Sequence, residues 1–248
     1  SIAPTFTIKV HKNGYSFLLG NLEGPLNHQL IEPLFDFENL INHRNENGGQ
    51  FRTDKKAIWS DTWLNWERAI YPGSTFQEAF TFGHSSRITL LEKNNFKLSI
   101  PLQVIMYHNG GQINTFKANP TLSLFNGAEG ISIEKKFPNH FIESMHLAYY
   151  FVNYRNISKE KSTSYYKQGY ASYPSLLIKT KYHINALLEY WDGHHYYSAK
   201  GSPVFSSVSY KWSFEGWNEP IRNLLFIRLL YEQEWLPGLF VNIRFEPY

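Results

Sequence analysis

The C-terminal stretch from Val204 to Tyr248 alternates between two kinds of side chain with a period of two residues. This period is typical of β-strands, because successive side chains point to opposite sides of the pleat. Three runs show it, over residues 204–215, 225–232 and 241–246, and short breaks rich in Gly and Pro separate them. Consecutive strands joined by short breaks predict an antiparallel meander.

The two faces of this meander differ in chemistry. One face is aliphatic in the middle and aromatic toward its ends, and we expect it to point outward: Val208, Tyr210, Ile227, Leu229 and Ile243. The other face carries charges that we expect to line a polar lumen: Lys211, Glu215, Arg228, Glu232, Arg244 and Glu246. A barrel that crosses a membrane needs this division, because its outer wall meets lipid and its inner wall meets water or polar side chains.

The same alternation recurs through most of the chain and predicts about ten to twelve strands, many about 10–16 residues long. Strands of soluble folds are usually about 5–6 residues long, whereas a tilted membrane-crossing strand needs about 9–11. Residues 25–43 break the rhythm with near-helical spacing and predict one or two short helices at the rim or in the lumen. We therefore expect an all-β, antiparallel up-and-down transmembrane β-barrel that residues 1–248 form as a single domain.

Composition favours a membrane interface and argues against several other classes. Charged residues make up only 18% of the chain and aromatic residues 17%, and Tyr and Trp favour places where one end of the ring is dry and the other wet. The net charge of +3, without a dense Lys/Arg stripe, argues against a nucleic-acid partner. Cysteine is absent, which removes disulfides and thiolate catalysis. No apolar run is long enough to predict a transmembrane helix.

The aromatic-ended meander over Val204–Tyr248 resembles bacterial outer-membrane β-barrels as a class, and the richness in Asn, Lys, Ile and Tyr is similar to barrels of the Bacteroidota. The resemblance implies the outer membrane of a Gram-negative bacterium, with the lipid bilayer and lipopolysaccharide as partners and room for other outer-membrane subunits. The sequence departs from the class at its end, where Tyr248 is out of phase with Phe245 across Pro247. Either the last strand ends at Phe245 or the natural chain runs further.

Ten histidines raise the question of a metal or catalytic site. His194 and His195 are adjacent, so in a strand they point to opposite faces and cannot chelate one ion together. The sequence contains no His-Glu-x-x-His motif, no Gly-rich phosphate loop and no Gly-x-Ser-x-Gly motif. We therefore expect no metal and no cofactor.

Two Ser–His combinations would suit an outer-membrane hydrolase such as a barrel phospholipase or a lipid A deacylase. Ser144 and His146 share one face of a predicted strand, and His84, Ser85 and Ser86 are consecutive. Neither combination has an evident third residue to orient the histidine. Polar lumen side chains that bond to their neighbours are the simpler interpretation.

The leading hypothesis is a non-enzymatic barrel, porin-like or an accessory subunit of a larger envelope complex, with an interior filled by paired charges. The first alternative is an outer-membrane lipid hydrolase, a lipid A deacylase or a phospholipase, that uses Ser144 with His146 or His84 with Ser85. The second alternative is a soluble all-β carbohydrate-binding sandwich. Its sugar platforms would be Trp59, Trp63, Trp191 and Trp217.

Overall fold

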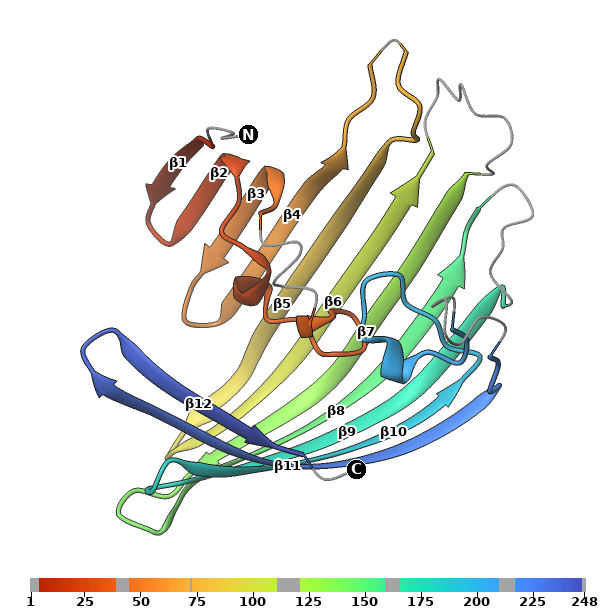
Figure 1. The fold of residues 1–248 in the computed structure, drawn as a ribbon. Helices are drawn as coiled ribbons and strands as arrows, with labels where there is room; N and C mark the ends of the chain where they lie inside the picture. Colours follow the sequence, from red (N-terminus) through yellow and green to blue (C-terminus); the bar gives the residue numbers. More distant parts are fainter. Residues whose placement is uncertain are drawn as a thin grey trace.

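The computed structural model describes residues 5–38, 45–71, 73–110, 121–158, 166–209 and 217–246. In these ranges, twelve antiparallel strands form one sheet whose order follows the chain, and the sheet curls around an interior (Figure 1). The strands are β1 (Thr7–Lys12), β2 (Tyr15–Asn21), β3 (Asn47–Asp54), β4 (Ile58–Arg68), β5 (Ala79–Lys93), β6 (Phe96–Asn109), β7 (Leu122–Lys136), β8 (Ile142–Asn156), β9 (Gln168–Thr180), β10 (Ile184–His194), β11 (Ile221–Leu236) and β12 (Leu239–Phe245). This order confirms the expected all-β, up-and-down barrel.

The strands are as long as the alternation predicts. Strands β5, β7 and β8 each contain 15 residues, and β11 contains 16. Every strand pairs with its neighbours in the sequence, so that β1 and β12 are the two edges of the described sheet. A two-sheet sandwich is therefore wrong, and the buried positions of Trp63 and Trp191 are unsuited to sugar platforms.

The outer face of the sheet is apolar. Ile227, Leu229 and Ile243 from the expected outward set are all exposed there. The register continues this face across the sheet, because the outward positions of neighbouring strands lie beside one another. Further exposed apolar side chains on this face include Ile100, Leu102, Ile131, Leu147 and Leu188.

The interior is filled by two segments of the chain, which we call the plugs. The first plug is residues 22–36, which follow β2, and the second is residues 195–209, which follow β10; Figure 1 shows both inside the curve of the sheet. They share one buried hydrophobic cluster with the inner wall. Its members include Leu22, Leu30, Leu34, Trp63, Tyr154, Tyr173, Trp191, Tyr196 and Phe205.

The short helical segment expected in residues 25–43 is the 3-10 helix η1 (Pro25–His28), which begins with a proline as short helices often do. Residues 39–43 of that range lie outside the described part. Among the described residues, no helix is both long enough and apolar enough to cross a membrane.

The predicted strand over residues 204–215 is wrong where it can be checked. The chain there forms a second 3-10 helix, η3 (Pro203–Phe205), and Val208 makes a single bridge to Asn218. Phe205 packs edge-on against Trp191, with ring centroids 5.0 Å apart. Val208 is consequently buried at 4% exposure instead of facing outward. Tyr210, Lys211 and Glu215 lie outside the described residues.

Candidate functional site

A carboxylate–imidazole contact between Asp192 and His194 lies on the outer face at the end of β10. His194 Nε2 is 3.1 Å from Asp192 Oδ1, and the two side chains are 28% and 39% exposed. The residues are two positions apart in one strand, so the pleat points both side chains to the same side. The ring of Tyr170 on β9 stacks on the imidazole, with centroids 4.9 Å apart and planes 13° from parallel.

The register of β9 places a serine next to this pair. Ser172 pairs directly with Asp192, and Tyr170 pairs with His194. The hydroxyl of Ser172 donates a hydrogen bond to Tyr149 Oη at 3.3 Å. A carboxylate, an imidazole and a hydroxyl are thus neighbours on one exposed face, although the structure shows no direct hydrogen bond from Ser172 to His194.

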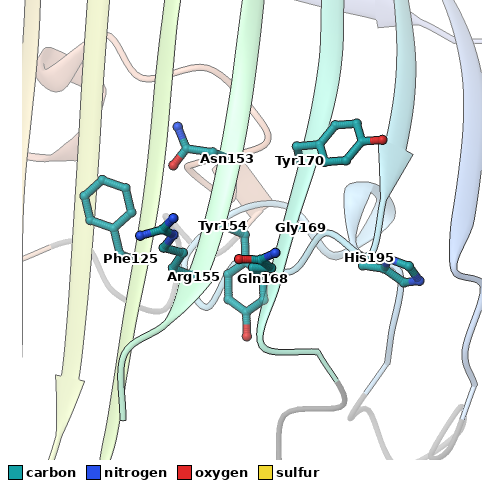
Figure 2. Close-up of a pocket in the computed structure, with 8 residues that line it drawn as sticks. All are labelled: Phe125, Asn153, Tyr154, Arg155, Gln168, Gly169, Tyr170 and His195. Carbon is teal, nitrogen blue, oxygen red and sulfur yellow. The ribbon is translucent and has the colours of Figure 1, made fainter.

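A pocket of about 450 Å³ lies on the same wall (Figure 2). Tyr170 lines this pocket and also stacks on His194, so the pocket lies beside the carboxylate–imidazole pair. Figure 2 shows Arg155, Asn153 and Gln168 around the same space, with the ring of Phe125 at one side and His195 at the other. The pocket therefore combines one cation, two amides and aromatic rings, which suits a ligand with an anionic polar part and an apolar part.

The pocket and the carboxylate–imidazole pair lie at the end of the sheet where the connections are long. The connection from β8 to β9 covers residues 157–167, and the one from β10 to β11 covers residues 195–220. The opposite end has short turns such as residues 13–14 and 94–95. In outer-membrane barrels the long loops are extracellular and the short turns periplasmic.

The His194–Asp192 pair has the arrangement of a general base. Asp192 Oδ1 is 3.1 Å from Nε2 without hydrogen-bond geometry, and within the described residues no hydrogen bond engages Nδ1 of His194. A carboxylate beside one nitrogen stabilises the imidazolium that forms when the other nitrogen takes a proton. The pair can therefore activate a water molecule or a hydroxyl group at Nδ1.

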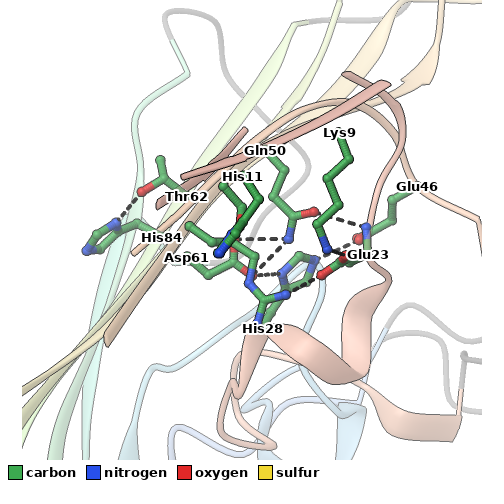
Figure 3. A network of polar contacts seen from close by, with 11 residues as sticks. Lys9, His11, Glu23, His28, Glu46, Gln50, Asp61, Thr62 and His84 are labelled. Carbon is green, nitrogen blue, oxygen red and sulfur yellow. Dashed lines mark hydrogen bonds and ion pairs between the residues drawn. The ribbon is translucent and has the colours of Figure 1, made fainter. Parts of the chain in front are cut away.

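His28 in the first plug lies inside the barrel and, unlike His194, has a carboxylate bonded to each of its ring nitrogens (Figure 3). Its Nδ1 is 2.9 Å from Asp61 Oδ2 and its Nε2 is 2.7 Å from Glu46 Oε2. The amide of Gln50 donates to both carboxylate oxygens of Asp61, at 3.0 and 2.9 Å. Because carboxylates occupy both ring nitrogens, His28 is a double donor and cannot take a proton from a nucleophile.

Burial and the neighbouring carboxylates shift the pKa of His28 in opposite directions. Burial by itself lowers the pKa of His28, but the hydrogen bonds to the carboxylates of Asp61 and Glu46 outweigh it and raise the pKa above its ordinary value. The imidazolium is the form that this environment favours. We therefore assign His28 to attachment of the plug rather than to chemistry.

A second polar network attaches the same plug to the far wall. The guanidinium of Arg228 on β11 binds Glu32 of the plug with two hydrogen bonds of 2.8 Å. It also contacts Glu189 on β10 at 2.5 Å and Glu246 at 3.0 Å. Buried charges in such a network must be paired.

The six charged residues expected to line the lumen differ in how deeply the structure buries them. Arg228 is buried inside and pairs with Glu246, which in turn binds Arg244 at 2.6 Å. Arg244 is half exposed, and Glu232 is exposed toward the short-turn end of β11. Lys211 and Glu215 lie outside the described residues.

The structure brings neither Ser144 with His146 nor His84 with Ser85 together, whereas a hydrogen bond of 3.1 Å joins His84 Nε2 to Ser86 Oγ. Ser144 and His146 share the inner face of β8, yet no hydrogen bond joins them in the described part of the chain, and His146 lines a small cavity of about 110 Å³. His84 and Ser86 point to the outer face of β5, whereas Ser85 is buried beside Asp61. His84 and Ser85 are thus on opposite sides of the wall and cannot act on one substrate.

Sequence reasoning missed the outer-wall pair because it compared His194 with its neighbour His195. The signal was present as Asp192-x-His194, since a spacing of two residues in a strand places both side chains on one face. No group of three or more His, Cys, Asp or Glu side chains in the described ranges is arranged to hold a metal ion.

Of the comparisons with known proteins, only the one with protein-family models gives a match. A family model described as lipid A 3'-O-deacylase-type matches the chain over residues 1–248. Comparisons with curated proteins and with solved structures give no match. Because the family model covers every residue, the chain belongs to the lipid A 3'-O-deacylase-type family.

Proposed function

We propose that this protein is an outer-membrane hydrolase that removes an ester-linked acyl chain from lipid A, with Asp192 and His194 as its base. The observation that carries the proposal is the carboxylate–imidazole pair on the outer wall beside a pocket of about 450 Å³. Family membership supports the lipid-hydrolase alternative over the porin-like hypothesis. The filled interior supports it too, because a plugged barrel is poorly suited to passage of solutes.

The position of the pair fits an ester at the membrane surface. Lipid A anchors lipopolysaccharide in the outer leaflet, and its acyl esters lie where the sugar headgroup meets the hydrocarbon. The pair is on the outer wall, where this proposal places lipid, at the end with the long connections. The proposal therefore includes the outer membrane of a Gram-negative bacterium as the location and lipopolysaccharide as the partner.

The pair would catalyse hydrolysis through one proton transfer in each direction. Nδ1 of His194 takes a proton from water as the water oxygen attacks the ester carbonyl, and Asp192 stabilises the imidazolium. The tetrahedral intermediate then breaks its bond to the sugar oxygen, which receives the proton from His194. The products are a free fatty acid and a lipid A with one more free hydroxyl group. Ser172 would replace water as the attacking group only if its side chain turned from Tyr149 to His194.

The test is deacylation of lipid A by the purified protein in mixed detergent micelles, followed by mass spectrometry of the lipid. We expect loss of one acyl chain with the wild type, and a rate lowered by about 10²–10³-fold in His194→Gln and in Asp192→Asn. The matched control is His146→Gln, a histidine on the inner face that should leave the rate unchanged. Full activity in both outer-wall variants would refute the site, and inactive wild-type protein would refute the function.

A further inference from the structure

A small polar cavity of about 110 Å³ lies on the inner face of the wall, toward the short-turn end of strands β5–β8. We call it the inner cavity. It has room for more than one water molecule, but it is much smaller than the pockets of about 300–1,000 Å³ that take drug-sized ligands. Its size therefore suits a small ion. Two cations, two hydroxyl groups, one carboxylate and one imidazole line it: Arg87, Lys97, Ser99, Ser132, Glu134 and His146.

The two cations of the inner cavity are half-buried, and no carboxylate among the described residues forms an ion pair with either of them. Arg87 Nη1 is 3.5 Å from the amide oxygen of Gln29 in the first plug, and the guanidinium lies 5.9 Å from the ring centre of Trp59. Neither of these partners is charged. Lys97 has no hydrogen bond with any part of the chain that the structure describes. Charges that are withdrawn from water favour a partner of opposite sign, so the cavity favours an anion.

Two buried serines supply hydroxyl groups to the inner cavity. Ser99 of β6 pairs with Ser132 of β7 in the register of the sheet, and the two residues are 2% and 6% exposed. Both line the cavity, and over the described ranges neither hydroxyl has a hydrogen-bond partner. Because buried polar groups are nearly always hydrogen-bonded, the two hydroxyls indicate a ligand in the cavity that accepts their hydrogens.

The carboxylate of Glu134 makes the inner cavity selective for an anion that carries a proton. Glu134 lies between its cross-strand partners Lys97 and His146, and its Oε1 is 3.7 Å from Lys136 Nζ. A carboxylate accepts hydrogen bonds and repels an anion that has no hydrogen to donate. Inorganic phosphate keeps a P–OH group at neutral pH and sulfate has none. A phosphomonoester has mostly lost its last proton there, because its second pKa is about 6.

We infer that the inner cavity is a binding site for inorganic phosphate. The guanidinium of Arg87 matches two phosphate oxygens with its fork of N–H groups, and Lys97 adds the second positive charge. The hydroxyls of Ser99 and Ser132 donate to the remaining oxygens, and the P–OH group of the ligand donates to Glu134.

The position of the inner cavity separates it from the proposed hydrolysis. Along the inner face of β6, Gln103 donates a hydrogen bond of 3.0 Å to the carbonyl of Gln29 in the first plug, and Ser99 and Lys97 follow toward the short turn. The phosphate site is thus on the short-turn side of the plug, which is periplasmic in outer-membrane barrels. The His194 site is on the outer face at the opposite end, so the two sites are independent.

Equilibrium dialysis of the purified full chain in detergent micelles against radiolabelled inorganic phosphate at neutral pH tests the site. We expect saturable binding, with a Kd that is weakened at least about tenfold in Arg87→Gln and in Lys97→Gln, since each loses a charge-assisted hydrogen bond. Lys93→Gln is the matched control and should bind like the wild type, because Lys93 is an exposed cation at the same end of the sheet but outside the cavity. Absence of saturable binding, or equal affinity in all three variants, would overturn the proposal.

Competition with unlabelled anions tests the selectivity. In the wild type, we expect sulfate and glycerol phosphate to compete at least about tenfold more weakly than phosphate, because neither can donate a hydrogen bond to Glu134 at neutral pH. In Glu134→Gln the side-chain amide can donate instead, so sulfate should compete about as well as phosphate. Equal competition by sulfate in the wild type and in Glu134→Gln would refute the role of Glu134. Glycerol phosphate that competes as well as phosphate in the wild type would overturn the assignment to inorganic phosphate in favour of a phosphomonoester.

Discussion

The imidazole of His28 lies flat on the indole of Trp63, with ring centroids 3.5 Å apart and ring planes 2° from parallel. The edge of the same imidazole binds the carboxylates of Asp61 and Glu46. A cation is thus stabilised at its edge by anions and at its face by an aromatic ring. The first plug is attached to the wall by charge as well as by apolar contact, and its attachment should depend on pH.

The first prediction concerns that pH dependence. The folded-state pKa of His28 is raised, so its contribution to stability is complete below the unfolded value of about 6.5 and is lost as pH rises through the folded-state pKa. We expect the melting temperature of the protein in detergent to fall more steeply above neutral pH in the wild type than in His28→Asn. Parallel curves for the two proteins between pH 5.5 and 9 would contradict this role of His28.

The second prediction uses a glycine that makes room for the stacked pair. A Cβ on Gly83 would lie 2.1 Å from the indole of Trp63, and Trp63 has no space to retreat because it is buried against His28. We expect Gly83→Ala to lower the free energy of unfolding by about 1–3 kcal/mol. Gly49 is the matched control, because a Cβ there meets nothing within 4 Å. Urea unfolding in detergent micelles measures both, and equal stability of the two variants would be evidence against the tight fit.

The predictable part of this fold is the part that local periodicity determines. Ile227, Leu229 and Ile243 face outward as expected, since a strand's pleat fixes which side chains share a face. The stretch from Val204 has the same periodicity but turns inward, because Pro203 starts a 3-10 helix and Phe205 packs on Trp191. Periodicity shows that apolar and polar side chains alternate along a segment, but it does not show whether a neighbouring strand will form hydrogen bonds with that segment.

The polar networks of the interior could not be predicted from local sequence patterns, for a related reason. His28 meets Asp61 across 33 positions of sequence, and Glu32 meets Arg228 across 196. Such contacts depend on where the plugs enter the barrel, which no short motif encodes. The Asp192–His194 pair is different, because its spacing alone predicts a shared face.

The third prediction concerns the buried guanidinium of Arg228. Replacing Arg228 with Met would leave the carboxylates of Glu32, Glu189 and Glu246 close together without their shared cation. Removal of one partner from a buried ionic network costs about 3–5 kcal/mol, so we expect a loss of that order in urea unfolding. Lys136→Met removes an exposed cation 3.7 Å from Glu134 and should cost less than about 1 kcal/mol. Similar losses in the two variants would show that the Arg228 network is not what holds the plug.

The last prediction separates binding from chemistry at the outer-wall site. Arg155 is the cation of the pocket beside His194, and lipid A bears phosphate groups on its sugars. A charge-assisted hydrogen bond to phosphate contributes about 1.5–3 kcal/mol. We therefore expect Arg155→Gln to raise KM for phosphorylated lipid A by about tenfold or more with little change in kcat, since the contact is the same in the ground state and the transition state.

Two comparisons make this outcome specific to phosphate recognition. With lipid A from which the phosphates have been removed, wild type and Arg155→Gln should have the same KM, because the group that Arg155 binds is absent. Arg155→Lys should recover part of the affinity, since it keeps the charge but loses the two-pronged geometry. A fall in kcat alone would place Arg155 at the reacting carbonyl instead, where it would stabilise the negative charge of the transition state.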